Sequence, residues 1–429
     1  MPRKKRKKLH YAWIILFGVI LVRGFAGGGI NTVSGLFLSP VSRDIGVGIG
    51  SLSIYFSIIS IVMIIWLPAA GKLIHRFDIR IMALTGAVLM IVPFIAFGSM
   101  YKLYGWYLLA VPYAMGSTIL VNLLGPILIN RWFSKNAGLM LGIQMAFVGL
   151  FGAVFQPLAS AIIVQRGWRS GYRMIGWIAF AAVIFSAIFI LKNKPEDKKL
   201  LPYGISDISV RKADNILPSS SVEIDEKTAV RSISFYLLLL FMISITGVGV
   251  FTQHIPTYGS ILGYSIQKTG LALSYASVGN AAGSVAIGII SDKIGSLKTC
   301  YGMIAIGIIS VTGFIFSDVS FLIFGVSAFL FGLTTSGIMV LAPILTISYY
   351  GKKDYEKIFA KVSMGAPLAS VFLIPAYGFV YDWFNHYVFV LLGMLVLLVI
   401  AAVSIAIGWK NRCTLEGCPS FGWGSKTGK

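Results

Sequence analysis

Residues Gly71 to Arg76 read GKLIHR, and residues Gly288 to Lys293 read GIISDK, 217 positions further along the chain. Further matches share this offset: Pro126-Ile127-Leu128 with Pro343-Ile344-Leu345, and Gly46 with Gly263. Self-similarity at one fixed offset over such a length indicates a duplicated unit. The sequence therefore predicts two halves that are built alike and are related by a pseudo-twofold axis.

The composition places this duplicated chain in a lipid bilayer. Hydrophobic residues make up 57% of the chain and charged residues 12%. A membrane-spanning helix needs about 20 mainly apolar residues, and twelve such stretches occur, six on each side of residues 192–231. The predicted spans are 11–38, 51–70, 80–99, 104–130, 136–164, 172–191, 233–256, 269–291, 297–316, 320–349, 357–381 and 386–409. We therefore expect an all-α polytopic membrane protein with two pseudo-symmetric six-helix bundles.

The domain organisation follows from these spans. The predicted parts are a basic tail at 1–10, a six-helix bundle at 11–191, a linker at 192–232, a second six-helix bundle at 233–409 and a tail at 410–429. The linker begins with the charged run KNKPEDKK and also contains prolines and acidic residues. We expect a mostly solvated strap with room for a short amphipathic helix.

The net charge of +21 is distributed unevenly between the two sides of the membrane. All but seven of the 36 Lys and Arg residues fall on the side of the basic tail. The seven are Arg23, Arg43, Lys102, Arg166, Arg169, Arg173 and Lys268. The positive-inside rule then places both termini and the linker in the cytoplasm, in a multi-pass protein of the plasma membrane. The basic tail PRKKRKK serves as a topology anchor that can also attract anionic lipid, so no nucleic-acid partner is expected.

Several other function classes are excluded by what the sequence contains. Cys300, Cys413 and Cys418 form no disulfide framework, and Cys413 and Cys418 lack the further ligands that a metal site needs. GSKT at Gly424–Thr427 lacks the glycine spacing of a phosphate loop. The apolar run after the basic tail is too long for a signal peptide. We expect no cofactor, no metal, no enzymatic activity and a monomer.

Glycines spaced four apart mark expected helix contacts. In lipid, small residues let helix backbones approach closely, and such smooth surfaces also permit rocking. The pairs are Gly24 with Gly28, Gly138 with Gly142, and Gly279 with Gly283. We interpret most of them as positions of tight packing.

The loop after the second predicted span resembles the signature of the major facilitator superfamily, a G-x-L-x-D-R-x-G-R/K type motif. Gly71, Leu73 and Arg76 match it in the first half, and Gly288, Asp292, Lys293 and Gly295 match it in the second. The first copy departs from the motif, with His75 at the acidic position and Asp78 at the second glycine position. The resemblance implies a transporter with two rocking six-helix halves. It also implies cytoplasmic gate loops, formed by Gly71, Arg76, Asp78, Gly288, Asp292, Lys293 and Arg131.

A second stretch narrows the resemblance. Residues Asn130–Leu158, followed by Gly167-Trp168-Arg169, are similar to the aromatic-basic loop and glycine-rich fifth helix of the monocarboxylate transporter and oxalate/formate antiporter groups. The matching residues are Arg131, Phe133, Lys135, Gly138, Gly142, Gly149 and Pro157. The charged pair that monocarboxylate transporters usually carry in helix 8 is replaced by Asn280 and Ser284, and the helix 1 lysine by Asn31. The resemblance implies a small organic anion as substrate, held differently in this chain.

Arg23 is the main candidate for binding that anion. It lies twelve residues into the first span, about 18 Å deep at 1.5 Å per residue. A charge at membrane depth usually has a function, and a guanidinium fork matches a carboxylate. The alternative is that the long side chain snorkels to the interface.

Two further titratable residues have alternative interpretations. Lys361 matches the region of the substrate-binding lysine in helix 11 of the oxalate/formate group, but it also lies close to the cytoplasmic loop, where it would be an interfacial anchor. His254, near the outer end of the seventh span, could couple a proton or be a hydrogen-bonded structural residue. The neutral polar residues that could complete a site include Asn31, Asn122, Gln144, Gln156, Gln253, Tyr275 and Asn280. Of these we select Asn31, Asn122, Tyr275 and Asn280 as hydrogen-bonding walls.

Acidic residues are absent from the interior of all twelve predicted spans, which disfavours a proton relay through a buried carboxylate and suits an anionic substrate. We predict a secondary transporter of a small organic anion, most simply a monocarboxylate, that works by alternating access, either linked to protons or by anion exchange. The alternatives are efflux of amphiphilic drugs or metabolites and, from another class, a non-transporting membrane sensor. The repeat pairs Arg23 with Leu240, Gln144 with Lys361, and Phe37 with His254. The charged candidates therefore mark where the duplication loses its symmetry.

Overall fold

The computed structural model describes residues 10–134, 137–198, 200–204, 224–351 and 354–412. Within these ranges the chain is helical, and the β-pairing is limited to one isolated bridge between Phe133 and Tyr203. This confirms the predicted all-α class. The basic tail, most of the linker, Cys413, Cys418 and the GSKT stretch lie outside the described residues.

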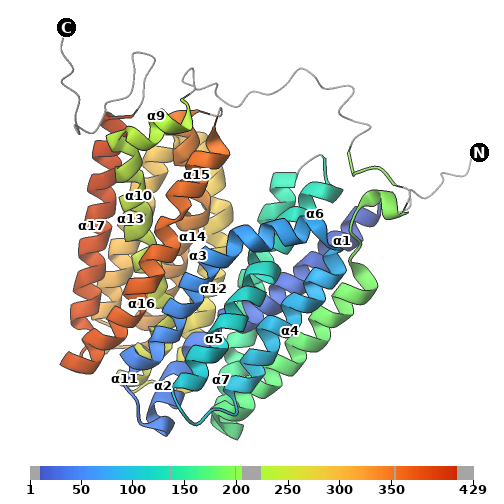
Figure 1. Cartoon of the computed structure of the whole chain (residues 1–429). Coiled ribbons are helices and arrows are strands. Elements are labelled where there is room, and N and C mark those ends of the chain that lie inside the picture. The colour runs from blue at the N-terminus through green and yellow to red at the C-terminus, as the bar shows by residue number, and fades with distance from the viewer. Residues whose placement is uncertain (1–9, 135–136, 199, 205–223, 352–353, 413–429) are drawn as a thin grey trace, which may run out of the picture. The chain divides into compact units, whose positions relative to one another are not determined.

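The contacts of the chain group it into two compact units (Figure 1). The first comprises Met1–Phe37 and Val62–Asn215, and the second comprises Leu38–Ile61 and Ile216–Lys429. In this grouping, Leu38–Ile61 belongs to the second unit. Hydrogen bonds from this segment to the helix Gly365–Phe384 provide the physical reason.

The helices of the first unit are those of the first repeat. They are α1 (Tyr11–Arg23), the π-helical η1 (Gly24–Asn31), part of α3 (Ile49–Arg76), α4 (Ile79–Phe97), α5 (Tyr104–Ser117), the π-helical η2 (Thr118–Leu123), α6 (Leu124–Trp132), α7 (Ala137–Phe185), the π-helical η3 (Ser186–Ile190) and the short 3₁₀ turn η4 (Pro195–Lys198). Asp78 begins α4 by accepting a hydrogen bond from the backbone nitrogen of Arg80, as an N-cap residue does.

The helix α7 contains two membrane crossings. It has 49 residues, and a straight helix of that length would extend about 75 Å, whereas the hydrocarbon core is about 30 Å thick. Gly167 interrupts it with φ 79° and ψ 161°, a conformation that glycine adopts readily. Eleven described helices are long and apolar enough to cross a membrane. Because one of them divides at Gly167, they account for the twelve predicted spans.

The second unit contains most of α2 (Ser34–Ile45), the start of α3 and the helices of the second repeat. These are α9 (Glu226–Arg231), α10 (Ile233–Gly249), the 3₁₀ turn η5 (Val250–Gln253), α11 (Ile255–Ile261), α12 (Ile266–Ile294), α13 (Ser296–Ile315), α14 (Phe321–Tyr350), α15 (Tyr355–Ser363), α16 (Gly365–Phe384) and α17 (Val388–Lys410). The predicted span 233–256 is divided by a break near His254, and the predicted span 357–381 by one at Met364.

The repeat found in the sequence corresponds to a shared backbone conformation. Gly46 and Gly263 follow α2 and α11, and their φ angles are 68° and 84°. Positive φ is strained for residues with a Cβ atom. The glycine at both positions therefore reflects the same turn in the two halves.

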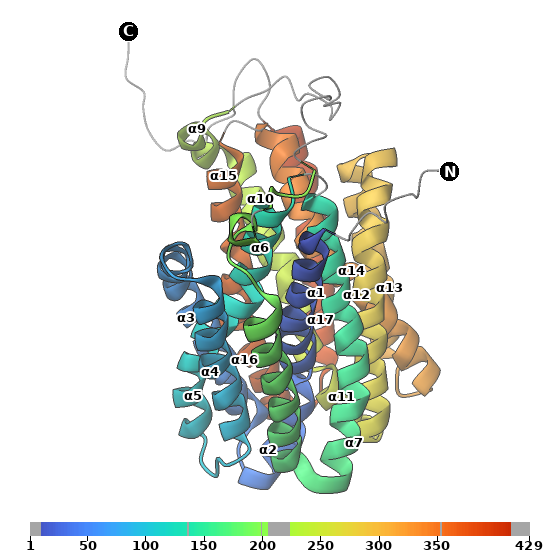
Figure 2. The same ribbon diagram turned by 90° about the vertical axis from the view of Figure 1, so that its right-hand side faces the viewer.

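The glycine pairs of α12 and of the first helix lie at close helix contacts. A Cβ atom on Gly279 or Gly283 would collide with α14, at the carbonyl of Phe329 and the hydroxyl of Ser336. A Cβ on Gly24 would lie 2.8 Å from the ring of Phe151 in α7. Figure 2 shows α1 and α7, which contact one another, side by side.

In the remaining pair, Gly142 does not support tight packing. A Cβ on Gly142 would have no atom within 4 Å, so the expectation of a close contact is wrong there. The surroundings of Gly138 lie outside the described set.

Candidate functional site

Arg23 is the last residue of α1 and directly precedes the π-helical segment η1. Its side chain is 3% exposed, and its Nε and Nη1 atoms are buried without a hydrogen-bond partner in the described structure. Burying an unpaired charge costs several kcal/mol. This geometry disfavours the snorkelling alternative, because the guanidinium is enclosed by protein instead of reaching a surface.

Gln144 of α7 lies next to Arg23, and both side chains pack against Gly125 of α6. A Cβ atom on Gly125 would lie 2.7 Å from Cδ of Arg23 and would collide with Oε1 of Gln144. Gln144 is 0% exposed, and neither its Nε2 nor its Oε1 has a hydrogen-bond partner in the described structure. The absence of a side chain at Gly125 thus leaves room for two unpaired polar groups on neighbouring helices.

Two π-helical segments flank this cluster. Arg23 adjoins η1 and Gly125 follows η2 closely, and η1 and η2 contact one another. The wider π turn is rare and is often found at functional sites, because it displaces side chains from the regular helical register. Both segments belong to the first unit. We define Arg23, Gln144 and Gly125 as the Arg23 cluster.

Asn31 and Asn122 lie on the same two π-helical segments. The Nδ2 of Asn31 donates to Oγ of Ser117 at 3.4 Å, and its Oδ1 accepts from the hydroxyl of Tyr113. Asn31 therefore ties the first helix to the fourth span. Asn122 is exposed, with Nδ2 at 3.4 Å from Sδ of Met63. Both predicted wall residues share the first unit with Arg23.

Tyr275 and Asn280 lie on α12 in the second unit. Tyr275 is 42% exposed. The side chain of Asn280 donates to Oγ1 of Thr335 on α14 at 3.1 Å. Asn280 therefore bonds a neighbouring helix in this structure, whereas the ring of Tyr275 is accessible.

His254 is buried between the short turn η5 and α11, and both of its ring nitrogens have partners. Nδ1 lies 2.9 Å from the hydroxyl of Tyr387, and Nε2 lies 2.9 Å from the carbonyl oxygen of Ile374. A carbonyl can only accept, so Nε2 carries the proton and Nδ1 accepts from Tyr387. Of the two interpretations of His254, this geometry supports the hydrogen-bonded structural residue.

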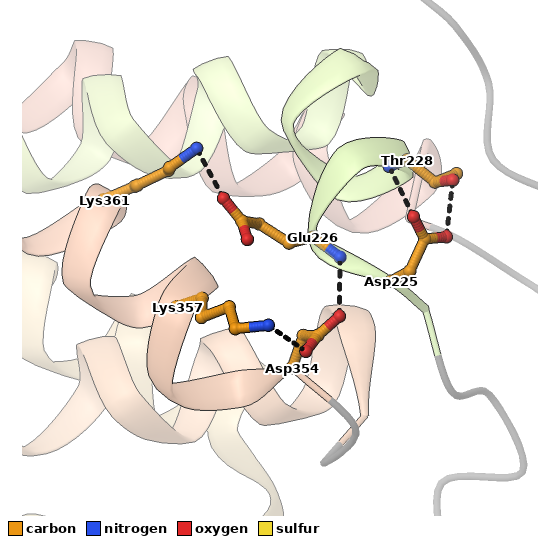
Figure 3. A network of polar contacts seen from close by, with 6 residues as sticks. All are labelled: Asp225, Glu226, Thr228, Asp354, Lys357 and Lys361. Carbon is orange, nitrogen blue, oxygen red and sulfur yellow. Dashed lines mark hydrogen bonds and ion pairs between the residues drawn. The ribbon is translucent and has the colours of Figure 1, made fainter.

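Lys361 forms an ion pair with the linker helix α9. Its Nζ lies 2.7 Å from Oε1 of Glu226, and its side chain is 45% exposed. Figure 3 shows that Glu226 also donates its backbone N–H to Asp354, at 3.1 Å, and that Lys357 pairs with Asp354 at 3.0 Å. This network fastens α9 to α15. The structure thus supports the anchoring interpretation of Lys361.

The predicted gate residues Gly71, Arg76 and Asp78 lie near the end of α3 and the start of α4. Gly71 lies within the last two turns of α3, and a Cβ there would have no atom within 4 Å. Arg76 ends α3 and is exposed. Asp78 caps α4, and its Oδ1 accepts from Arg80 at 2.7 Å. Asp78 thus has a local structural role as a helix cap.

The other predicted gate residues lie at helix ends of both units. Arg131, near the end of α6, donates from Nη1 to the side chain of Asn193 at the start of the linker. Lys293 is exposed in the last turn of α12, just before Gly295 with φ 88°. Gly288 and Asp292 belong to α12, and their side chains lie outside the described set.

The Arg23 cluster offers one recognisable chemistry. A guanidinium presents N–H donors in a planar fork that fits a carboxylate in a bidentate manner. Gln144 adds an NH2 donor group and a carbonyl acceptor, neither of which has a partner among the described residues. Gln144 is among the neutral polar residues of the predicted spans but is not one of the four predicted wall residues. Its pairing with Lys361 in the repeat was the signal that could have identified it.

Comparisons with known proteins agree on the family. The sequence model of the Major Facilitator Superfamily matches residues 16–327 and 237–412. The uncharacterized MFS-type transporter YhjX of Escherichia coli (strain K12) is 20% identical over 364 residues, which cover 84% of this chain and 86% of the relative. Monocarboxylate transporter 4 of Gallus gallus is 20% identical over 404 residues, covering 93% and 82%. The oxalate:formate antiporter of Oxalobacter formigenes is 23% identical over 269 residues, covering 62% and 60%.

A solved structure agrees with the fold. The inward-facing and unoccupied structure of a bacterial homolog to the human lysosomal transporter Spinster aligns with a TM-score of 0.72 at 12% identity, covering 96% of this chain and 100% of that one. At this identity the likeness concerns the fold alone. The family match spans nearly the whole chain, and the chain therefore belongs to the Major Facilitator Superfamily of membrane transporters.

Proposed function

We propose that this transporter moves a small organic anion, specifically a monocarboxylate, and that Arg23 binds the carboxylate. The observation that supports this is the buried guanidinium of Arg23, whose Nε and Nη1 have no partner in the described structure. A carboxylate supplies both the opposite charge and the two acceptors that such a fork needs. Among the relatives, two are named for the transport of carboxylates, a monocarboxylate transporter and an oxalate:formate antiporter.

The proposed transport cycle is alternating access by rocking of two similar halves. Both termini and the linker lie in the cytoplasm, and the protein resides in the plasma membrane. Asn31, Asn122, Tyr275 and Asn280 serve as hydrogen-bonding groups for the substrate, and coupling is by proton symport or anion exchange. In this proposal Lys361 and His254 have secondary roles. Lys361 is already paired with Glu226, and both ring nitrogens of His254 already have hydrogen-bond partners.

The test is uptake of labelled lactate, pyruvate, formate and oxalate into proteoliposomes. We expect uptake of monocarboxylates by the wild type and at least a tenfold loss in Arg23→Gln, since hydrogen bonds to a charged group contribute about 1.5–3 kcal/mol each. Arg43→Gln is the matched control, because Arg43 is an exposed arginine near the end of α2. If none of the four acids is moved, or if Arg23→Gln moves them as well as the wild type, the proposal fails.

A further inference from the structure

Packing alone does not explain Gln144, because burying its unpaired amide costs free energy. Its side chain is fully buried on α7, and neither its donor nor its acceptor finds a partner in the described structure. Leaving buried polar groups unpaired destabilises a fold, so an apolar side chain of similar size would pack better at this position. The amide also lies beside Arg23, with Gly125 making room for both. These observations indicate that the amide is kept for a ligand.

The chemistry of the amide restricts that ligand. A carboxylate can only accept hydrogen bonds, so it can use the N–H groups of Arg23 and of Gln144 but can never satisfy Oε1 of Gln144. In the described structure that oxygen accepts no hydrogen bond from Arg23, so a donor next to the bound carboxylate would satisfy it. A hydroxyl on the carbon beside the carboxylate both donates to Oε1 and accepts from Nε2. A ketone at the same carbon accepts only, and an unsubstituted acid offers the amide no such group.

We propose that Gln144 is a specificity-determining residue, which binds a hydroxyl beside the carboxylate and makes the transporter prefer 2-hydroxy monocarboxylates to 2-oxo and unsubstituted ones. The proposal rests on the proposed function, because Arg23 must hold the carboxylate for Gln144 to reach the neighbouring carbon. It predicts a fixed order of preference among acids of three carbons. Lactate is preferred to pyruvate, and pyruvate is preferred to propionate.

The experiment compares uptake of labelled lactate, pyruvate and propionate by the wild type and by Gln144→Met in proteoliposomes. We expect the wild type to prefer lactate to propionate by about tenfold or more in kcat/KM. In Gln144→Met, lactate uptake falls by about that factor and propionate uptake is retained, so the preference disappears. Gln156→Met is the matched control, because Gln156 is an equally buried glutamine of the same helix.

The outcomes separate this inference from the proposed function. If the wild type moves all three acids with equal kcat/KM, or if Gln144→Met keeps the preference for lactate, the inference is overturned while anion transport stands. If the wild type moves none of the three acids, the proposed function fails first. The wild-type ratio needs no variant, so an absent preference for lactate would overturn the inference even if Gln144→Met folded poorly.

Discussion

The carboxylate of Asp382 fastens the start of α3 to α16, and its removal should release that contact. Oδ1 accepts the backbone N–H of Ile49 at 3.0 Å, and Oδ2 accepts the backbone N–H of Gly50 at 2.7 Å. Ile49 is the first residue of α3, so these are N–H groups that no intrahelical carbonyl can satisfy. Ser57 adds a hydrogen bond to the carbonyl of Val371 at 2.6 Å. Together these bonds hold Leu38–Ile61 in the second unit.

The cost of Asp382→Asn follows from these two bonds. Each hydrogen bond to a charged group contributes about 1.5–3 kcal/mol, and a negative charge at a helix N-terminus contributes up to about 2 kcal/mol in a partly buried site. These contributions overlap, and asparagine keeps one carbonyl acceptor. We therefore expect a net loss of about 2 kcal/mol, which is about 30-fold in the equilibrium between the attached and the released segment.

The assay measures how often the segment is released. Ser53 is fully buried on α3, so a cysteine there, in a background without the three native cysteines, should react slowly with a maleimide. Asp382→Asn should speed the reaction by about the same 30-fold if release limits access. Asp318→Asn is the control, because Asp318 is exposed and its substitution changes the charge equally. Equal labelling rates in the two variants would refute the role assigned to Asp382.

Three further predictions concern other contacts. His254→Ala should lower the free energy of unfolding by about 2–4 kcal/mol and leave the pH profile of uptake unchanged. Thermal unfolding in detergent and uptake between about pH 5.5 and 7.5 measure the two effects. A loss of the pH dependence would instead assign proton coupling to His254. Lys361→Gln should change uptake less than fivefold, like Glu226→Gln, because half-exposed ion pairs contribute about 0–1 kcal/mol; a loss above tenfold would return Lys361 to the substrate site. Gly28→Val should abolish folding, because a Cβ there would collide with the backbone of α7, whereas Gly142→Ala should express normally; size-exclusion chromatography distinguishes the two.

The sequence alone predicted the features that depend on local composition. Twelve apolar stretches, divided six and six, follow from the length of a spanning helix, and the offset of 217 correctly paired Gly46 with Gly263. Even the turn at Gly167 falls between the predicted spans 136–164 and 172–191. Such features depend on residues that are close in the sequence, so they can be predicted without knowledge of distant contacts.

Contacts between distant residues could not be predicted in this way. The bonds from Asp382 to Ile49 and Gly50 join residues more than 330 positions apart, and the sequence only places Asp382 at a helix end. The partners of His254 are equally distant, and they determine its tautomer. The π-helical turn beside Arg23 has no compositional signal either, since it depends on how neighbouring helices pack.

The lost symmetry of the repeat supports the anion site proposed at Arg23. Arg23 pairs in the repeat with Leu240, an apolar residue that is 40% exposed. Gln144 pairs with Lys361, whose charge is balanced by Glu226. One half therefore holds a buried cation whose Nε and Nη1 have no partner among the described residues, whereas the equivalent positions of the other half are apolar or neutralised. Equal binding of the anion by both halves would need a cation at the position of Leu240 as well. Under the proposed function, this asymmetry favours the first unit as the part that binds the negative charge.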